Sequence, residues 1–431
     1  MLHDNLGVNE QGHLTIGGVD TLALAEKYGT PLYVMDEDKL RSNCRIYTSA
    51  FAKYMPSGSM PLFASKSLCC KRIYSVIDSE GMGTDLVSPG ELYTASAAGF
   101  ELQKAFFHGN NKTDADIEYA VDSGVGFFII DNREEADKLN SYAASKGIKQ
   151  KALLRLTPGI DPHTHAKIST GKVDSKFGTA IETGQAEQFI AYVLGLSNID
   201  LRGYHCHIGS QIFDIAPFTD AADIMLDFAG FINKKYGYMC EYLNLGGGFG
   251  VRYVESDPDI DIDANIKAVS EHISGRCAAN AIPVPKILME PGRSIVADAG
   301  LTLYTVGSVK EITGFKNYVS IDGGMTDNPR YALYQSPYTV LNAGRADVRP
   351  DYVCTVAGRC CESGDLIQED VKIVKPARGD VIAVLVTGAY NHAMAMTYNK
   401  VPRPAMVFLK DGKDSLAVRR ETYADLMALD V

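Results

Sequence analysis

The stretch KAFFHGNNKTDADIEYAVDSGVGFFIID, residues 104–131, contains the signals for a strand, a helix and a second strand. Its two ends, KAFFHG and FFIID, are short apolar and aromatic runs of the kind that form buried strands. The segment between them, KTDADIEYAVDSG, is helix-like and ends at a glycine, where many helices stop. A strand, a helix and a second strand in this order form a βαβ unit, in which one βα unit of an α/β fold is followed by the next strand.

The same alternation continues on both sides of this stretch. Helix signals include NREEADKLNSYAASKG, which also ends at a glycine, and SPGELYTASAAG, where Ser88 can cap the helix and Pro89 fits its first turn. Eight strand and helix alternations over about 250 residues match a TIM-like (β/α)₈ barrel better than an open doubly wound sheet. We therefore predict an α/β barrel over residues 35–295. Its other strands are predicted at Met60–Ser65, Met82–Ser88, Lys151–Thr157, Arg202–Ser210, Glu241–Gly247 and Lys286–Gly292.

The texture of the chain changes after Arg293. The runs LTLYTVGSVKEITG, KNYVSIDGG, DYVCTVAG and DVIAVLVTGAY are rich in β-branched and aromatic residues and are separated by Gly, Pro and Asp. The N-terminal segment HLTIGGVDTLALAEKYGTPLYVMD contains a strand pair around a short helix. We predict that residues 1–34 and 296–431 together form a second, mainly antiparallel β domain.

The composition bounds the class of function. The chain has 53 acidic and 42 basic residues and a formal net charge of −11, which disfavours nucleic acid or an anionic membrane as its main partner. Its nine cysteines include two adjacent pairs and no paired CxxC spacing, so neither a zinc ribbon nor a disulfide framework is indicated. No apolar run approaches the roughly 20 residues that span a bilayer, and the start lacks a signal-peptide pattern. These features predict a cytoplasmic protein with reduced thiols.

Two motifs lie where barrel strands end, and the carboxyl ends of the strands face the active site in such barrels. GGGFG (Gly246–Gly250) can close its backbone N–H groups around an anion such as a phosphate, although a tight turn explains the glycines equally well. In MEPGRS (Met289–Ser294), Arg293 suits a phosphate and Glu290 could accept a proton from a ring nitrogen. A plain ion pair between these two side chains is the alternative.

The motif HCHIGS places His205 and His207 on one face of a strand. A metal site would need further ligands, and no His, Asp or Glu cluster elsewhere has a matching spacing, so we predict no metal. A histidine at the barrel rim could instead stack on an aromatic ligand. A buried histidine bonded to a backbone carbonyl remains the alternative for either residue.

Lys66 lies in MPLFASKS, at the end of a predicted strand. Phosphate donors, a carboxylate for a pyridine nitrogen, an aromatic platform and a lysine at a strand end together describe a site for pyridoxal phosphate. The apolar residues before Lys66 would desolvate its amine and favour the neutral, nucleophilic form. Taken alone, Lys66 is explained better as a snorkelling or salt-bridged cation.

The chain resembles, from end to end, the alanine-racemase-fold (fold type III) pyridoxal phosphate decarboxylases. The resemblance is specific because many motifs occur in the family's order. They are FASKS around Lys66, HGNNKTD (His108–Asp114), HTHAKISTGKVDSKFG (residues 163–178), HCHIGSQ, GGGFG, EPGRS, DGGMTDNPRYALY (Asp322–Tyr334), CESGD (Cys361–Asp365) and TGAYNHAMAMTYN (Thr387–Asn399).

The resemblance implies a role for each matching residue. Lys66 would carry the cofactor, His207 would stack on its ring and Glu290 would pair with the pyridine nitrogen. Cys361 would protonate the α-carbon after CO₂ leaves, since a thiol with a pKa near about 8.5 can deliver a proton at neutral pH. The remaining cofactor residues would be Asp85, Ser210, Gly247, Gly248, Gly292, Arg293 and Tyr390, and the substrate residues Arg293, Arg330, Tyr334, Glu362 and Tyr390.

In this family Cys361 and Glu362 reach the site from the partner subunit, which implies a head-to-tail homodimer with shared active sites. The neighbouring Cys360 is disfavoured as the acid, because it would point away if the pair is extended. Small buried apolar side chains are the alternative explanation for both cysteines.

Substrate choice depends on the end of the amino acid remote from the reacting carbon. Related enzymes act on ornithine, arginine or carboxynorspermidine, whereas meso-2,6-diaminopimelate carries an ammonium and a carboxylate there. Arg330 and Glu362 could bind these two groups, and STGKVDSKFG and CESGD fit the diaminopimelate branch best. The resemblance therefore implies decarboxylation of meso-2,6-diaminopimelate to L-lysine. A decarboxylase of another basic amino acid and a catalytically silent, ligand-binding homologue are the alternatives.

One position departs from the family pattern. The family usually has Gly-Pro before the cysteine motif, whereas AGRCCESGD places Arg359 in the position of the proline. Arg359 adds a charge close to the predicted interface loop, which would alter either the rigidity of the loop or the substrate preference.

Overall fold

The computed structural model describes residues 1–160 and 175–431. The described chain divides into two compact units. We call Cys44–Gly250 with Ile260–Gly292 the barrel unit, and Met1–Asn43 with Val251–Asp259 and Arg293–Val431 the β unit.

These bounds differ from the predicted breaks after residues 34 and 295. Strand β4 (Leu32–Asp36) pairs with two strands of the β unit, which draws the residues after 34 into that unit. Residues 251–259 also belong there: the Thr339 hydroxyl, for example, donates to the carbonyl of Tyr253 (2.9 Å). Helix α2 (Glu37–Tyr54) is divided between the two units.

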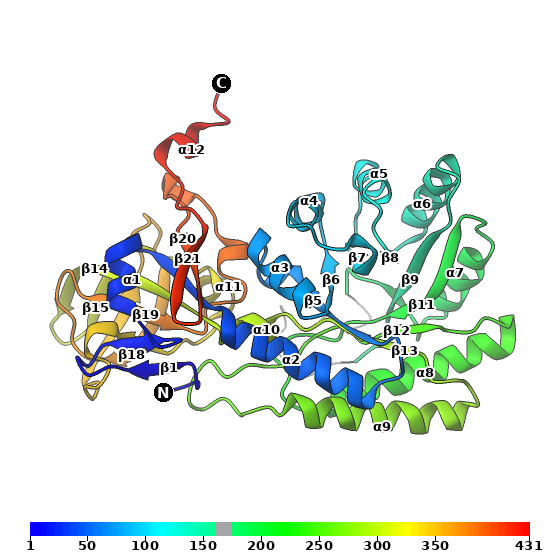
Figure 1. The fold of residues 1–431 in the computed structure, drawn as a ribbon, viewed down its shortest axis with the longest axis horizontal. Helices are drawn as coiled ribbons and strands as arrows, with labels where there is room; N and C mark the ends of the chain where they lie inside the picture. Colours follow the sequence, from blue (N-terminus) through cyan, green and yellow to red (C-terminus); the bar gives the residue numbers. More distant parts are fainter. Residues whose placement is uncertain (161–174) are drawn as a thin grey trace. The chain divides into compact units, whose positions relative to one another are not determined.

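Eight parallel strands close into a barrel (Figure 1). Each strand pairs with its neighbour in parallel, and the last strand pairs with the first through Leu288 opposite Met60. The predicted α/β barrel is therefore confirmed, with all eight predicted strands. In order around the barrel they are β5 (Met60–Ala64), β6 (Gly83–Leu86), β7 (Ala105–Phe107), β8 (Phe127–Ile130), β9 (Gln150–Thr157), β11 (Ile199–His205), β12 (Tyr242–Asn244) and β13 (Lys286–Met289). The short β10 (Thr179–Ala180) extends the sheet beside β9.

The helices between the strands begin where the sequence provides caps. The Ser88 hydroxyl accepts the backbone N–H of Glu91, and Thr113 with Asp116 forms a capping box. The three predicted helices, α4, α5 and α6, are confirmed. The helices are α3 (Lys71–Ser79), α4 (Pro89–Ala97), α5 (Asp114–Asp122), α6 (Arg133–Ser145), α7 (Gln185–Leu194), α8 (Ala216–Tyr236) and α9 (Ile262–Asn280). Within residues 1–160 and 175–431, no helix combines the length and the apolar character that crossing a membrane requires.

The barrel interior is packed with side chains rather than open. Phe106 and Phe127 stack with ring centroids 4.5 Å apart and planes 6° from parallel. The cluster around them consists of Leu62, Ile129, Leu153 and Leu288, each at most 1% exposed. Together with Phe106 and Phe127, these residues come from five different strands, so the cluster connects the barrel wall.

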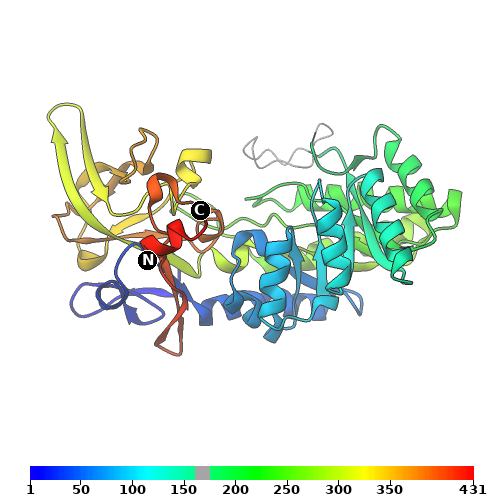
Figure 2. The same ribbon diagram turned by 90° about the horizontal axis from the view of Figure 1, so that it is seen from above.

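A mixed, mainly antiparallel sheet forms most of the β unit. Its long strand β14 (Gly300–Ile312) pairs antiparallel with β4, β15 (Lys316–Ile321) and β19 (Val381–Leu385), and Figure 2 shows the β14–β15 hairpin in yellow. Two pairings, β15–β17 and β20–β4, are parallel. The other strands are β16 (Val340–Asn342), β17 (Tyr352–Ala357), β18 (Leu366–Ile373), β20 (Ala405–Lys410) and β21 (Lys413–Val418).

The four C-terminal runs singled out in the sequence are β14, β15, β17 and β19. The N-terminal segment adds a small sheet of β1 (Leu6–Val8), β2 (Leu14–Ile16) and β3 (Val19–Asp20), followed by α1 (Thr21–Tyr28). Strand β4 then enters the large sheet between β14 and β20, so the prediction that this segment joins the β-rich domain is confirmed.

Replacing Phe106 by alanine should destabilise the barrel unit. The change removes one partner of the aromatic stack and leaves a cavity, so we expect the free energy of unfolding to fall by about 3–5 kcal/mol. Urea unfolding followed by circular dichroism measures it. Phe315 is 89% exposed in the turn between β14 and β15, and Phe315→Ala as the matched control should change stability by less than about 0.5 kcal/mol. Equal losses for the two variants would contradict the packed barrel core.

Candidate active site

A cluster of buried polar side chains lies at the carboxyl ends of four barrel strands. Glu290 follows β13, His108 follows β7, His205 ends β11 and Asn244 ends β12. All four are at most 7% exposed. The strands are distant in sequence, and closure of the barrel is what brings these side chains together.

The Glu290 carboxylate is the centre of this cluster. Its Oε1 accepts a hydrogen bond from Nδ2 of Asn244 (2.7 Å) and lies 3.0 Å from Nε2 of His108, while Nε2 of His205 lies 3.3 Å from Oε2. Burial alone would raise the pKa of Glu290, but His108 and His205 act in the opposite direction and hold it well below its ordinary value. Burial lowers the pKa of His205 to about 4. At neutral pH Glu290 is therefore a carboxylate facing a neutral His205.

The ligand atoms of His108, His205 and Glu290 lie within 4.8 Å of one another, a spacing that could accommodate a metal ion. The sequence did not reveal this group, because its members come from three separate strands. The prediction that the protein needs no metal stays a prediction.

Lys66 lies in a 3₁₀ turn (Ser65–Ser67) directly after β5. Asp85, at the end of β6, anchors this turn by accepting the backbone N–H of Ser65 at Oδ1 (2.9 Å). Burial, together with the charge of Glu290, raises the pKa of Asp85 to about 6. Ser65 and Ser67 are buried, whereas Lys66 is exposed. The predicted desolvation of Lys66 by the strand is therefore wrong for this structure, because the turn directs only the flanking serines inward.

The GGGFG loop connects the Glu290 cluster to His207. A Cβ on Gly247 would lie 2.0 Å from the carbonyl oxygen of Glu290, so only glycine fits there. The N–H of Gly247 donates to Nδ1 of His207 (3.2 Å), and burial lowers the pKa of His207 well below its ordinary value. Among the described residues the N–H of Gly248 has no acceptor, which leaves it available to an anion.

Two further buried ionic groups lie near these residues, and their sequence context did not mark them. Arg155 on β9 lies over the ring of Phe177, 4.3 Å from its centroid, with Nε 4.0 Å from Oδ1 of Asp131. Lys112 donates to Glu135 (2.7 Å) and to two backbone carbonyls. The motif HGNNKTD contains Lys112 and was the available signal, but its partner Glu135 lies 23 residues further along the chain.

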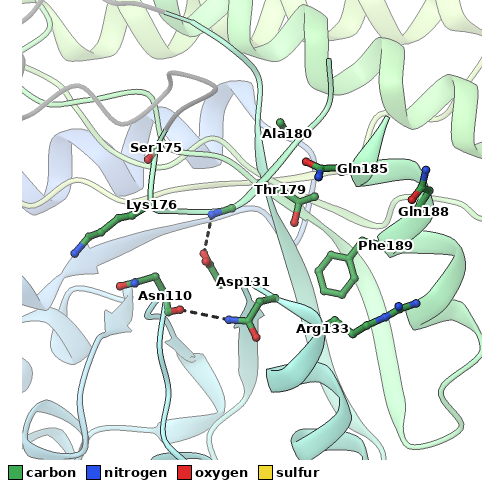
Figure 3. Close-up of a pocket in the computed structure, with 12 residues that line it drawn as sticks. Asn110, Asp131, Arg133, Ser175, Lys176, Thr179, Ala180, Gln185, Gln188 and Phe189 are labelled. Carbon is green, nitrogen blue, oxygen red and sulfur yellow. Dashed lines mark hydrogen bonds between the residues drawn. The ribbon is translucent and has the colours of Figure 1, made fainter. Parts of the chain in front are cut away.

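A cavity of about 650 Å³ lies beside β8 and β10 in the barrel unit (Figure 3). Its wall includes Asn110, Asp131, Arg133, Lys176 and Gln188. The N–H of Gly178 donates to Oδ1 of Asp131 (3.0 Å) there. None of the residues predicted for the cofactor or the substrate lines this cavity.

The β unit contains a second polar cluster, built from arginines and tyrosines. Arg293, the first residue of α10 (Arg293–Val296), donates from Nη1 to the hydroxyl of Tyr253 (2.7 Å) and lies 4.7 Å from the ring centroid of Tyr390. Arg330, the first residue of α11 (Arg330–Tyr334), donates to the hydroxyl of Tyr338 (2.9 Å) and lies 4.7 Å from the Tyr253 ring. The tyrosine rings thus lie against both guanidinium groups.

Arg330 carries a buried charge that forms no ion pair within the described part of the chain. It is 6% exposed, and no carboxylate of the described residues lies within 4.0 Å of it. Although burial opposes the charge, the surrounding tyrosines raise the pKa of Arg330, so it is always protonated. A buried cation with only neutral partners suits an anionic ligand.

The other predicted site residues of the β unit are Tyr390, Tyr334 and Glu362. Tyr390 has a φ of +61°, a conformation that costs strain in a residue other than glycine. Tyr334 is half-buried at the end of α11, and Glu362 is exposed.

The loop around Cys361 is held by hydrogen bonds to its backbone. Asp365 accepts the N–H of Cys360 at Oδ2 (2.7 Å), and Asn399 accepts the N–H of Cys361 (2.8 Å). Cys361 is exposed, whereas Cys360 is half-buried and burial raises the pKa of its thiol to about 11. The N–H of Arg359 donates to the carbonyl of Gly323 (3.0 Å), a bond that a proline in this position could not make.

Within each unit, the structure thus brings some of the predicted site residues together. Asp85, His207, Gly247, Gly248 and Glu290 lie together in the barrel unit, with Ser210 and Gly292 on neighbouring segments. Arg293, Arg330 and Tyr390 lie together in the β unit. Residues 163–174 of the motif HTHAKISTGKVDSKFG lie outside the described residues. The role of each of these residues stays a prediction.

Known proteins are similar to this chain along its whole length. A family model described as "Pyridoxal-dependent decarboxylase, pyridoxal binding domain" matches residues 37–297. The diaminopimelate decarboxylase of Bacillus subtilis (strain 168) is 44% identical over 430 residues, which are 100% of this chain and 98% of that protein. The enzyme of the same name from Staphylococcus aureus (strain COL) is 42% identical over 427 residues, 98% of each chain. The crystal structure of diaminopimelate decarboxylase from M. jannaschii in complex with L-lysine gives a TM-score of 0.91 at 35% identity and covers 100% of this chain and 98% of that one.

Replacing Gly247 by alanine should disturb the Glu290 cluster. The new Cβ would meet the carbonyl of Glu290 at 2.0 Å, and because both groups are backbone the strand end must shift, at a cost of about 1–3 kcal/mol. Thermal unfolding measures the loss. Gly275 in α9 is the matched control: nothing lies within 4 Å of its added Cβ, so Gly275→Ala should stabilise the helix by about 0.5–1 kcal/mol. The same sign for both substitutions would count against a loop that requires glycine.

Proposed function

This chain belongs to the pyridoxal-dependent decarboxylase family, and we propose that it converts meso-2,6-diaminopimelate to L-lysine and CO₂, the last step of lysine biosynthesis. Full-length relatives with that name, at 44% and 42% identity, support the proposal. The relative from M. jannaschii binds L-lysine in its crystal, which would be the product of this reaction. We further propose that the protein acts in the cytoplasm.

The observation that carries the choice of substrate is the buried charge of Arg330. Diaminopimelate has a carboxylate at the end remote from the reacting carbon, whereas ornithine and arginine have only cationic groups there. Arg330 offers a rigid fork of donors and has only neutral partners among the described residues, Tyr338 and Ser336. A distal carboxylate would neutralise this charge, while a distal cation would be repelled by it. Glu362 is proposed to bind the distal ammonium.

The residues of the barrel unit fit pyridoxal phosphate. Glu290 is an ionised, buried acceptor suited to a pyridinium N–H, and the free N–H of Gly248 suits a phosphate oxygen. We propose that Lys66 holds the cofactor covalently and that His207 lies against its ring. Asp85, Ser210, Gly247, Gly292, Arg293 and Tyr390 are proposed to complete the cofactor site, with Arg293, Tyr334 and Tyr390 also binding substrate. Bound pyridoxal phosphate supplies a sink for the electron pair that departing CO₂ leaves behind.

The reaction also needs a proton. Each CO₂ that leaves is replaced by one hydrogen on the α-carbon, so one proton is consumed per turnover. We propose the thiol of Cys361 as its donor, because Cys361 is exposed and Cys360 is partly buried with a pKa raised to about 11. We propose in addition a head-to-tail homodimer in which each subunit presents Cys361 and Glu362 to its partner. The exposure of both side chains supports this assembly.

Replacing Arg330 by alanine should abolish recognition of the distal carboxylate. We expect CO₂ release from diaminopimelate to lose at least about 100-fold in kcat/KM, since a charged hydrogen-bonded pair is worth about 2–5 kcal/mol. Coupled CO₂ and lysine assays measure it, and borohydride fixation of the cofactor on Lys66 shows that the variant is loaded. Arg276→Ala, which removes an exposed ion pair with Asp227, is the matched control and should have no effect. Wild-type protein that releases no CO₂ from diaminopimelate but does so from ornithine would refute the proposed substrate.

Replacing Cys361 by alanine should slow protonation and leave cofactor binding intact. We expect kcat to fall by about 10²–10⁴-fold, the usual contribution of a positioned general acid, or lysine to be replaced by a misprotonated product. CO₂ and lysine are measured together, and cofactor absorbance serves as the loading control. Cys360→Ala is the matched variant and should keep most of the rate. A larger loss in Cys360→Ala than in Cys361→Ala would reverse the assignment of the acid.

A further inference from the structure

Glu290 is a buried charge that forms no ion pair with a lysine or arginine of residues 1–160 and 175–431. Among the described residues, its ion-pair contacts are with His108 and His205 alone. Burying a carboxylate is costly unless hydrogen bonds replace the lost water. The groups that surround Glu290 must therefore stabilise its charge by hydrogen bonds, in place of a salt bridge.

Asn244 is held in the orientation that donates to Glu290. Its Oδ1 accepts the N–H of Gly246 (2.9 Å), which leaves Nδ2 to face Oε1 of Glu290 (2.7 Å). Gly246 in turn accepts the N–H of Glu290 at its carbonyl (2.9 Å). The amide orientation is thus fixed by a closed ring of three hydrogen bonds, and the same ring ties Glu290 to the glycine loop.

His205 donates to the other oxygen. Its Nε2 lies 3.3 Å from Oε2, and its Nδ1 is buried without a partner among the described residues. With a pKa lowered to about 4, the ring is neutral, and the tautomer that carries the proton on Nε2 is the one that matches a carboxylate. The contact with Glu290 is thus the hydrogen bond that the His205 ring makes among the described residues.

The Glu290 carboxylate has a hydrogen-bond acceptor position that its neighbours do not fill. An ionised carboxylate has about four lone-pair positions, two on each oxygen. On Oε1, Asn244 takes one position, and Nε2 of His108 is the second polar neighbour, 3.0 Å away without hydrogen-bond alignment. On Oε2, His205 takes one position. One acceptor position, on Oε2, is left.

We propose that Asn244 and His205 are positioning residues that hold Glu290 ionised and leave one acceptor position for the N–H of the cofactor's pyridinium ring. The inference rests on the proposed cofactor site and deepens it. A protonated carboxyl group would face donors on both sides, so the cluster disfavours any proton on Glu290 and favours one on the ring nitrogen. The predicted consequence is a binding preference for a cofactor whose ring can donate that proton.

The test compares two cofactors that differ at this one atom. The purified apoprotein is titrated with pyridoxal phosphate and with its 1-deaza analogue, in which CH replaces the ring nitrogen, and both dissociation constants are measured by absorbance. The wild type should bind pyridoxal phosphate at least about tenfold more tightly, the discrimination expected from one charged hydrogen bond. In His205→Leu this preference should fall to near unity.

Conservative replacement separates positioning from mere packing. The amide nitrogen of glutamine can reach the place of Nε2, so His205→Gln should retain most of the preference. His272→Leu, which alters an exposed histidine paired with Asp223, is the matched control and should leave both constants unchanged. Asn244→Ala provides a second variant should His205→Leu fail to fold, and it should also lose the preference.

Three results would overturn the proposal. The first is an unchanged preference in His205→Leu and Asn244→Ala. The second is an equal loss of affinity for both cofactors, which would show a structural role only. The third is a stoichiometric metal ion in the purified protein that is lost in His205→Leu. Because the readout is binding, a protein that keeps the preference but does not decarboxylate diaminopimelate would refute the substrate and leave this inference standing.

Discussion

The burial of the Glu290 carboxylate is the constraint on which the candidate site depends. Its four neighbours, His108, His205, Asn244 and the loop at Gly246, come from strands up to 182 residues away in sequence, and they meet only when β13 pairs with β5 and closes the barrel. An open sheet would leave the ends of β5 and β13 at separate edges. Closure of the barrel therefore assembles the groups that keep Glu290 ionised. The same closure places the glycine loop where it hydrogen-bonds Glu290.

The two units hold buried charges of opposite sign, Glu290 and Arg330. Within residues 1–160 and 175–431, Glu290 has only histidines as ion-pair partners and Arg330 has no carboxylate. The barrel unit surrounds Glu290 with histidine and amide groups, and the β unit surrounds Arg330 with the hydroxyls of Tyr338 and Ser336 and the ring of Tyr253. Each charge is tolerated because neutral groups hydrogen-bond it, and each remains able to bind an ion of opposite sign. A pyridinium N–H and a distal carboxylate are the groups that the family's chemistry would supply. The charges of the two clusters are thus opposite to those of the proposed cofactor's ring N–H and of the proposed substrate's distal carboxylate.

Local patterns predicted most of the fold. All eight barrel strands are short apolar runs bounded by turn residues, and helix α4 begins at the cap that Ser88 provides. Most features that the sequence did not predict are long-range. The ion pair of Lys112 with Glu135 and the contacts of His108 with Glu290 depend on which strands become neighbours, and no local pattern contains that information. The exposure of Lys66 depends on a turn of three residues, and the assignment of residues 251–259 to the β unit depends on contacts made after Arg293.

The loop before Cys361, where the sequence departs from the expected Gly-Pro, is held by hydrogen bonds to its backbone. A proline would restrict φ at position 359, whereas Arg359 uses its N–H to bind the carbonyl of Gly323. Asp365 then collects the N–H groups of Cys360 and Met325 on its two oxygens, 2.7 and 2.5 Å away. These bonds hold the backbone of the loop. Cys360 is half-buried there and burial raises its pKa to about 11, whereas the adjacent Cys361 is exposed. The Arg359 N–H bond thus holds the loop at a position where a proline would have no N–H to donate, and Arg359 is exposed at the surface where the partner subunit is proposed to bind.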